Sequence, residues 1–409
     1  MNMRESLKKN QLIYQVYALY KAKLEEKRAN AELKFYRKQA QKQGINALEN
    51  DMLTLALRER LKKRGIEPCP KKKGGLHIFL AYNLENWEVI LQNVLSRFGE
   101  VTEFEFRNRG FECNSSDWLR QRDRMNREMF NSFFDSNSKK HIDVFVGYLS
   151  GHNTDPMTLR KIGETGAVIF NFCLDDKLKF RSVKIGGRWS GPAAIVREVD
   201  LNLTNAIDCR IKYAREGGLA LFWPQAADPI MHKPYEEPFL YDVSFVGQRY
   251  GWRSHLISTL RKRGIDVSVF GKGWDSGELS DDNMIKLYSK SRINLGFAGV
   301  SRSNKLMCLK GRDFEVTMSG GFYLTQHHPE LSLVYDVGRE IVTYRDAGDC
   351  AGKIKYFLAH PEEAQDIRTR GRERALRDHT WEKRFESIFE MAGIIEPAIS
   401  DNICVSSQK

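Results

Sequence analysis

A short stretch in the C-terminal half of the chain combines cations, a carboxylate and a strand in a pattern that can bind a nucleotide. Residues 310–325 read KGRDFEVTMSGGFYLT, which predicts a short helix, a two-glycine stop and a buried strand. Cations and free backbone N–H groups at a helix start can hold phosphate. A carboxylate one turn later can accept hydrogen bonds from ribose hydroxyls. Lys310, Arg312 and Glu315 are therefore candidate nucleotide-binding residues; the alternative is an amphipathic helix before a core strand.

Two earlier strand ends offer further phosphate contacts. Gly247, Gln248 and Arg249 follow one predicted strand, and Arg253 lies one turn into the next helix. The sequence Gly271-Lys272-Gly273-Trp274 ends the following strand. A lone Gly-x-Gly turn is a weak signal, and the spacing is wrong for a Walker A loop. The alternative for Arg249 and Arg253 is a solvated surface position.

Three residues in the first half could take or orient the proton of an acceptor hydroxyl. Asp175 and Asp176 close a predicted strand, and His152 follows the strand before it. A carboxylate or imidazole at such a position can act as a general base. All three are expected to face the space between two domains. The alternatives are an aspartate that caps a loop and a histidine on the surface.

Two series of alternating strands and helices must position these residues. Predicted strands lie at 77–82, 101–106, 142–148, 167–172, 199–203 and 219–223, and then at 242–247, 267–271, 293–297 and 322–325. Repeated β-α units of this kind indicate doubly wound parallel sheets, so the fold class is α/β with two Rossmann-like domains. Such sheets bind ligands beyond the carboxyl ends of their strands.

Composition places the boundaries of these domains. Residues 224–238 contain four of the eleven prolines, which predicts a stiff connection. The sequence thus predicts the following parts: a basic helical extension (1–74), an N-terminal Rossmann-like acceptor domain (75–223), a Pro-rich linker (224–240), a C-terminal Rossmann-like donor domain (241–379), a terminal helix that crosses back (380–395) and a tail (396–409).

The positive charge of the chain is concentrated at its N-terminus. Residues 1–75 hold 19 of the 65 basic residues but only 8 of the 53 acidic ones, so the rest of the chain is nearly neutral. Residues 5–43 and 47–64 are predicted to be helices. They could form a solvated hairpin that packs on its own domain or on another subunit through residues 1–64. They could also bind anionic lipid; nucleic acid is unlikely because no motif for it is present.

The C-terminal half resembles GT-B glycosyltransferases of the group-1, family 4-like type, and within them the spore-maturation CgeB-like branch. The resemblance rests on 310–325 and continues through 338–344, 353–363, 371–374 and 379–384. It implies a GT-B fold in which Glu315 binds the donor ribose. It also implies that the loop at Gly247, with Arg249 and Arg253, contacts the diphosphate, and that the turn at Gly271 and Lys272 lies by the base. Family 4-like enzymes often carry a second Glu eight residues before the first, where this chain has Met307.

The resemblance implies a metal-independent and retaining transfer of a sugar, from a nucleotide-diphosphate sugar to an acceptor hydroxyl in envelope or surface glycan synthesis. One alternative is a non-catalytic protein of the same fold that binds nucleotide or glycan; another is a nucleotide-sugar epimerase. No cofactor is expected, because no DxD motif stands at a strand end and His327-His328 lack ligand spacing. The expected partners are the donor and a glycan or lipid-linked acceptor. A cytoplasmic location is predicted, at most peripheral on the inner membrane face, because apolar spans and a signal peptide are missing.

Overall fold

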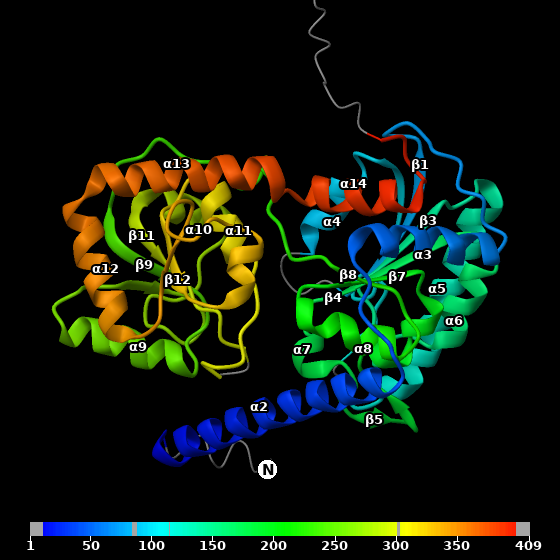
Figure 1. The fold of residues 1–409 in the computed structure, drawn as a ribbon, viewed down its shortest axis with the longest axis horizontal. Coiled ribbons are helices and arrows are strands. Elements are labelled where there is room, and N and C mark those ends of the chain that lie inside the picture. The colour runs from blue at the N-terminus through cyan, green and yellow to red at the C-terminus, as the bar shows by residue number, and fades with distance from the viewer. Residues whose placement is uncertain (1–10, 84–87, 114, 301–302, 398–409) are drawn as a thin grey trace, which may run out of the picture.

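The computed structural model describes residues 11–83, 88–113, 115–300 and 303–397. Most of the predicted tail, 398–409, lies outside the described residues. The described chain forms two parallel α/β domains, each built on one sheet, with a long N-terminal helix that reaches from one domain to the other (Figure 1). None of the helices in the described part of the chain is long and apolar enough to cross a membrane.

The N-terminal domain is a six-stranded parallel sheet with helices on both faces. Its strands follow the order β2-β1-β3-β4-β7-β8, and β1 and β4 are buried along their whole length, as expected for strands covered on both faces. The strands are β1 (Leu76–Tyr82), β2 (Gly99–Glu105), β3 (Val144–Gly147), β4 (Val168–Cys173), β7 (Leu201–Thr204) and β8 (Ala220–Phe222). The helices are α4 (Val89–Leu95), α5 (Trp118–Lys139), α6 (Pro156–Gly163), α7 (Asp176–Lys179) and α8 (Arg210–Arg215).

The C-terminal domain is a five-stranded parallel sheet with the order β10-β9-β11-β12-β13. Its strands are β9 (Tyr241–Val246), β10 (Ser268–Phe270), β11 (Ser291–Leu295), β12 (Tyr323–Gln326) and β13 (Val342–Tyr344). Its helices are α9 (Trp252–Lys262), α10 (Asp281–Lys290), α11 (Arg312–Met318), α12 (Ala347–Ala359) and α13 (Pro361–Asp378). The strand order changes direction between β9 and β11, because β10 follows β9 on one side and β11 lies on the other, as in a Rossmann unit. Ligands of such sheets bind beyond the carboxyl ends of the two strands at this point.

Two segments of chain connect the domains and run side by side. The backbone N–H of Ala227 donates to His379 O (3.0 Å), and the N–H of Trp381 donates to Ala227 O (3.1 Å). Beyond this crossing, α14 (Trp381–Ala392) packs against the N-terminal domain, where Trp381 and Phe385 join its buried core. Because the crossing is hydrogen-bonded twice, the two connections form one unit instead of two independent linkers.

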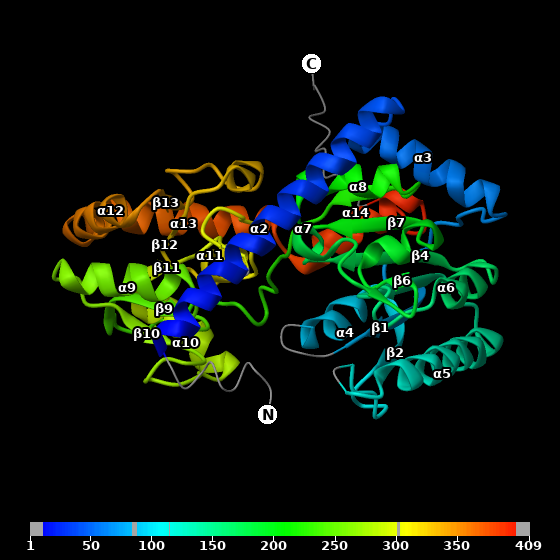
Figure 2. The same ribbon diagram turned by 90° about the horizontal axis from the view of Figure 1, so that it is seen from below.

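The N-terminal helices are integrated into the fold. Helix α3 (Asn50–Lys63) inserts Leu53, Leu57 and Leu61 into the main core of the N-terminal domain, where each is almost fully buried. Helix α2 (Gln11–Lys42) lies along α7 and α8 and extends to the C-terminal domain (Figure 2). Both helices thus pack on the rest of the chain, as one of the alternatives expected, but they do so separately and α2 also contacts the C-terminal domain.

The segment between α7 and β7 holds a feature that the sequence did not predict. A small antiparallel hairpin forms from β5 (Lys184–Ile185) and β6 (Arg188–Trp189), where the sequence showed only a glycine-rich excursion. Arg181, just before the hairpin, lies over the rings of Phe35 and Tyr36 of α2, and its Nε donates to the Tyr36 hydroxyl (2.7 Å). Helix α2 therefore supports this hairpin directly.

The contribution of α3 to stability can be measured with two leucines of the same helix. Leu57 is fully buried, whereas Leu55 is 63% exposed. We expect Leu57→Ala to lower the free energy of unfolding by about 2–5 kcal/mol, because it removes buried methyl groups and leaves a cavity. Leu55→Ala should change it by less than about 0.5 kcal/mol. Chemical denaturation of both variants measures the difference; equal effects would mean that α3 is not docked as described.

Candidate donor site at the domain interface

Strand β9 ends in a turn that brings the backbone into close contact with the turn after β10. Gly247 has φ 152°, and its N–H donates to Phe270 O (2.8 Å). A Cβ on Gly271 would lie 2.7 Å from the carbonyl carbon of Gly247, which only glycine avoids. Trp274 fastens the second turn to the first, since its Nε1 donates to Gly247 O (2.8 Å). Both predicted glycines, Gly247 and Gly271, are thus required by this close approach.

Two guanidinium groups converge on this turn. A Cβ on Gly247 would lie 3.3 Å from Nη1 of Arg253 and 3.4 Å from Nη2 of Arg312, so both groups border the same small volume. Arg253 comes from the first turn of α9 and Arg312 from the first turn of α11. Within the described part of the chain, no ion pair joins either guanidinium to a carboxylate, and Nε of Arg312 has no hydrogen-bond partner.

The electrostatic surroundings of the two cations differ: no carboxylate among the described residues pairs with Arg253, whereas the charge of Glu315 favours that of Arg312 without forming an ion pair with it. Burial, together with the nearby charge of Arg312, lowers the pKa of Arg253. Burial opposes the charge of Arg312 as well, but Tyr288 and Glu315 raise its pKa. Placing like charges in a buried site without a carboxylate between them is unfavourable. A bound phosphate anion would supply the negative charge that balances these two cations.

The carboxylate of Glu315 lies beside the start of α11. A Cβ on Gly311 would come within 2.4 Å of Oε1 of Glu315 and within 3.6 Å of Oε1 of Gln225. Glu315 is half-buried and folds back along its own helix toward the same edge as Arg312. A ribose that packed on Gly311 could offer its two hydroxyls to this carboxylate. Gln225, from the interdomain segment, is a neighbour that sequence reasoning missed.

The beginning of α11 is partly capped by its own side chain. The Lys310 N–H donates to Oδ2 of Asp313 (2.6 Å), and the Tyr323 hydroxyl donates to Oδ1 (2.8 Å). Burial raises the pKa of Asp313 to about 6. Because the cap uses the Lys310 N–H, phosphate binding at this end must rest mainly on side-chain cations. One of the backbone N–H groups that the sequence offered to a phosphate is therefore used within the protein.

The other predicted cations occupy different positions. The Lys310 Nζ donates to Sγ of Cys308 (3.2 Å), and although burial opposes it, Cys308, Tyr250 and Asp175 raise the pKa of Lys310. Lys310 of the C-terminal domain therefore lies near Asp175 of the N-terminal domain. Arg249 is exposed and lies over the Trp274 ring (5.2 Å), while Lys272 is exposed at the tip of its turn. The structure thus brings Arg253, Arg312 and Lys310 together within the candidate site and leaves Arg249 and Lys272 exposed to solvent at its edge.

A cavity of ≈490 Å³ lies at the carboxyl edge of the N-terminal sheet. His152 and Asp175 both line it, with Tyr148, Asn153 and Ser182. His152 is held there, because its ring stacks on Trp118 (5.6 Å) and its Nε2 bonds to Cys113 O (3.0 Å). The side chain of Asp175 is 54% exposed and pairs with Lys179 (3.3 Å). The lining of amides, hydroxyls and carboxylates suits a polar, sugar-like ligand.

Asp176 does not face this cavity, contrary to the sequence-based expectation. Its side chain is fully buried, and its Oδ2 accepts a hydrogen bond from the Tyr213 hydroxyl (2.8 Å). Burial raises the pKa of Asp176 to about 6. As the first residue of α7, Asp176 points into the domain, while its neighbour Asp175 points out. Asp176 therefore fixes α7 against α8 and has no access to a substrate.

Lys177 of α7 joins the two domains directly. Its Nζ donates to Met307 O (2.8 Å) and pairs with Glu330 (3.0 Å), both in the C-terminal domain. Met307 thus contributes its backbone carbonyl to the interface. His328 lies close by and is 2% exposed; burial and Lys177 lower its pKa to about 3. In the sequence, His328 was considered only as a metal ligand. Its burial beside Lys177 and Lys310 favours the neutral imidazole, so His328 is a neutral polar group next to this site.

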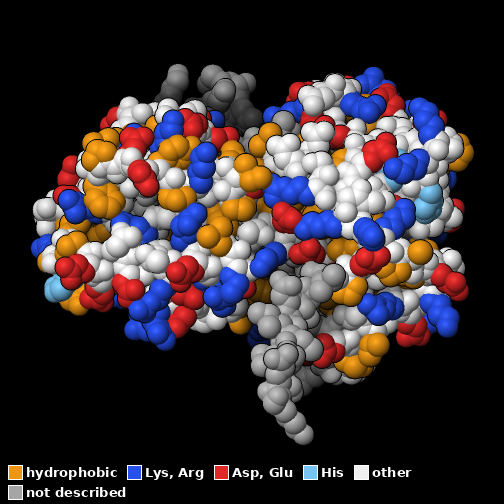
Figure 3. All heavy atoms as spheres, turned by 90° about the horizontal axis from the view of Figure 1, so that it is seen from above, with side chains coloured by type: hydrophobic (Ala, Val, Ile, Leu, Met, Phe, Trp, Pro, Cys, Tyr) orange, Lys and Arg blue, Asp and Glu red, His pale blue; other side chains and the backbone are white. Residues whose placement is uncertain are grey.

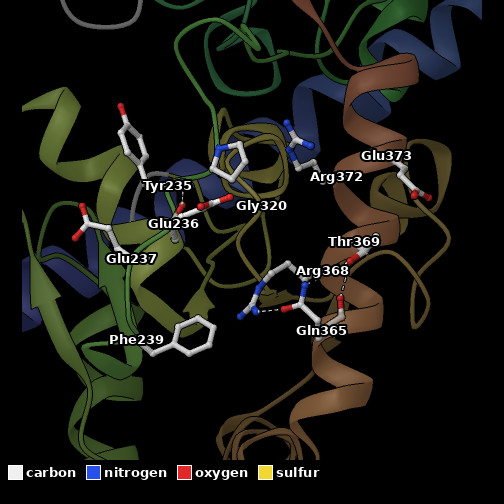
Figure 4. A pocket seen from close by; sticks show the side chains of 12 residues that line it. Tyr235, Glu236, Glu237, Phe239, Gly320, Gln365, Arg368, Thr369, Arg372 and Glu373 are labelled. Carbon is white, nitrogen blue, oxygen red and sulfur yellow. Dashed lines mark hydrogen bonds between the residues drawn. The ribbon is translucent and has the colours of Figure 1, made fainter.

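A second cavity, of ≈350 Å³, lies at the opposite edge of the C-terminal domain (Figure 4). It is bordered by the interdomain segment, with Tyr235 and Phe239, and by α13, with Arg368 and Arg372. The guanidinium of Arg368 is already engaged there: it donates to Gln365 (2.6 Å) and to Arg292 O (3.0 Å), and it lies over the Phe239 ring. This cavity is not lined by Arg253, Arg312 or Lys310 and offers no comparable set of groups.

Comparisons with known proteins agree with the architecture. Residues 252–390 match the family model of glycosyl transferase-like proteins. Sucrose-phosphate synthase from Thermosynechococcus elongatus is similar in structure (TM-score 0.55, 11% identity, covering 78% of this chain and 98% of that one). So are HepE from Anabaena in complex with UDP and glucose (0.52, 11%, 77% and 99%) and apo OtsA (0.53, 9%, 79% and 100%). No curated protein sequence matches the chain. At these identities the likeness concerns the fold, and the predicted GT-B fold is confirmed.

The uncompensated charge of Arg253 predicts an unusual effect on stability. Arg253→Met should change the free energy of unfolding by no more than about 1 kcal/mol, because it breaks no ion pair. The variant loses one hydrogen bond, to Gln248 O (3.0 Å), and the contact with the Tyr250 ring, but it also removes a buried charge that no carboxylate balances. As a control, Arg64 pairs with the buried Asp200, so Arg64→Met should cost about 3–5 kcal/mol. Denaturation of both variants without ligand tests this; a large loss in Arg253→Met would show that the guanidinium serves the fold.

Proposed function

We propose that this protein is a glycosyltransferase that moves a sugar from a nucleotide-diphosphate sugar to an acceptor hydroxyl. One observation carries the proposal: Arg253 and Arg312 converge on the Gly247 turn without a carboxylate partner, and Glu315 lies beside the same helix start. A diphosphate would supply the missing negative charge, and a ribose would fit the carboxylate. A glycosyl transferase-like match over 252–390, the half that holds these residues, supports this choice.

The reaction would divide between the two domains. The bond between the sugar C1 and the phosphate oxygen breaks, and its electron pair leaves with the nucleoside diphosphate, whose charge Arg253, Arg312 and Lys310 would stabilise. No metal is needed for this step in the proposal. The acceptor oxygen then bonds to C1, and its proton passes to Asp175 or to the departing phosphate. Asp175 is the better placed of the two predicted carboxylates, because it lines the cavity and lies near Lys310.

The donor class is supported by structures of the same fold. HepE has been determined with UDP-glucose (TM-score 0.52, 9% identity) and with UDP and glucose. We extend the proposal to a retaining transfer in envelope or surface glycan synthesis, which rests on the CgeB-like, family 4-like resemblance of 310–384. The same fold could instead serve a protein that binds nucleotide without turnover, and the experiments below distinguish the two.

Thermal unfolding with a panel of nucleoside diphosphates and nucleotide-sugars tests the donor assignment. A ligand at 100 times its Kd should add about 2.7 kcal/mol to the free energy of unfolding. Glu315→Ala should weaken binding of the preferred ligand about 10- to 100-fold, since a charge-assisted hydrogen bond is lost. Glu362→Ala, an exposed position on α13, is the control and should bind as the wild type does. A wild-type protein that responds to no nucleotide would contradict the proposal.

Turnover separates the enzyme from a binding protein. With the preferred nucleotide-sugar and a panel of soluble oligosaccharides, we expect release of free nucleoside diphosphate and a new glycosidic product. Asp175→Asn should lower the rate at least tenfold while leaving the affinity for the nucleotide unchanged. Nucleotide binding without any release would identify a binding protein, and a changed sugar epimer without an acceptor would identify an epimerase.

A further inference from the structure

The outward face of α2 carries charge of a single sign. From Tyr20 to Lys42, every exposed charged residue of the helix is basic: Lys23, Lys27, Arg28, Lys34, Arg37, Lys38 and Lys42. At about 100° per residue, these positions occupy one half of the helix circumference. A charge distribution this uneven is not expected from a helix that is merely solvated.

The acidic residues of α2 lie on its inner side and are used within the protein. Glu26 accepts a hydrogen bond from the Ser303 hydroxyl of the C-terminal domain (2.7 Å). Glu32 pairs with Lys212 of α8 (3.0 Å). Buried Ala22, Ala29 and Tyr36 lie on the same side and bring the helix close to the domains. The inner face is thus fixed by packing, a hydrogen bond and an ion pair, and the basic face points away from these contacts.

Apolar groups lie among these cations. Tyr20 is 65% exposed and Phe35 is 44% exposed, and both project from the outward half of α2. Val183 (62% exposed) lies in the supported hairpin segment next to Arg181, which stacks on Phe35. Aromatic and aliphatic tips between lysines are suited to the boundary between lipid headgroups and acyl chains. A partner that offered phosphates alone would leave these apolar tips unused, so the pattern favours lipid over nucleic acid.

The placement of the helix fits a flat surface. Helix α2 runs along the outside of both domains, on the side seen in Figure 2. On the opposite side of the molecule, basic and acidic side chains are interspersed (Figure 3). Because α2 is already folded and docked, binding a surface would not require the helix to be ordered, which lowers the cost of association.

We propose that the outward face of α2 binds membranes that are rich in anionic phospholipids, with the helix lying parallel to the surface. Lys23, Lys27, Lys34 and Lys38 form its central stripe and would contact the headgroups, while Tyr20 and Phe35 enter the interface. The inference is independent of the reaction assigned above. It concerns a surface that the donor site does not use.

Sedimentation of the full-length protein with vesicles tests this inference. The wild type should partition onto phosphatidylglycerol–phosphatidylcholine vesicles at low ionic strength and not onto phosphatidylcholine vesicles. The combined variant Lys23→Gln, Lys27→Gln, Lys34→Gln and Lys38→Gln should bind at least about tenfold more weakly, because each lysine near an anionic surface contributes to the attraction. Tyr20→Ser should reduce the binding that persists at high salt.

A variant with the same loss of charge elsewhere is the control. Arg127→Gln, Lys139→Gln, Lys262→Gln and Lys355→Gln change four exposed cations on α5, α9 and α12, and this combined variant should bind vesicles as the wild type does. Thermal unfolding confirms that both combined variants are folded. Equal partition of the two variants, or no partition of the wild type, would overturn the proposal. Binding to a DNA duplex but not to anionic vesicles would also overturn it, in favour of nucleic acid.

Discussion

The structure of the candidate site depends on one electrostatic constraint, the proximity of the buried guanidinium of Arg253 and the half-buried guanidinium of Arg312, neither of which forms an ion pair with a carboxylate among the described residues. Arg253 and Arg312 come from different helices and meet only because Gly247 leaves room between them. A buried cation without a counterion is unfavourable, so its presence at a strand end points to a ligand that carries the opposite charge. The tight turns at Gly247 and Gly271, and the docking of Trp274 on them, all preserve this small volume.

The rest of the molecule keeps the two halves of the site in register. The crossing at Ala227 and His379 hydrogen-bonds the two interdomain connections to one another. Buried His379 packs its ring on Phe314 of α11 (5.2 Å), so the crossing also contacts the helix that carries Arg312 and Glu315. Lys177 and Glu330 add a direct ion pair across the interface. A movement of one domain relative to the other would therefore also displace α7 and α11, the two helices that flank the site.

Sequence patterns were sufficient for the architecture because each element has a strong local signal. The first strand was predicted at 77–82, and the structure has β1 at Leu76–Tyr82, since its run of mostly apolar residues is a strong local signal for a buried strand. The site was harder to predict, because burial and proximity are tertiary properties. Asp175 and Asp176 are neighbours in the sequence, yet only the orientation of α7 decides that one lines a cavity and the other bonds to Tyr213. Likewise, nothing near His328 in the sequence indicates Lys177, which comes from the other domain.

The most direct test of the donor site is a crystal structure of the protein with the nucleoside diphosphate that stabilises it best. The account predicts that the diphosphate lies at the Gly247 turn, with oxygens in hydrogen-bond contact with Arg253 and Arg312. It also predicts that both ribose hydroxyls donate to Glu315. A nucleotide bound elsewhere, such as in the cavity between Tyr235 and Arg372, or a ribose turned away from Glu315, would contradict it.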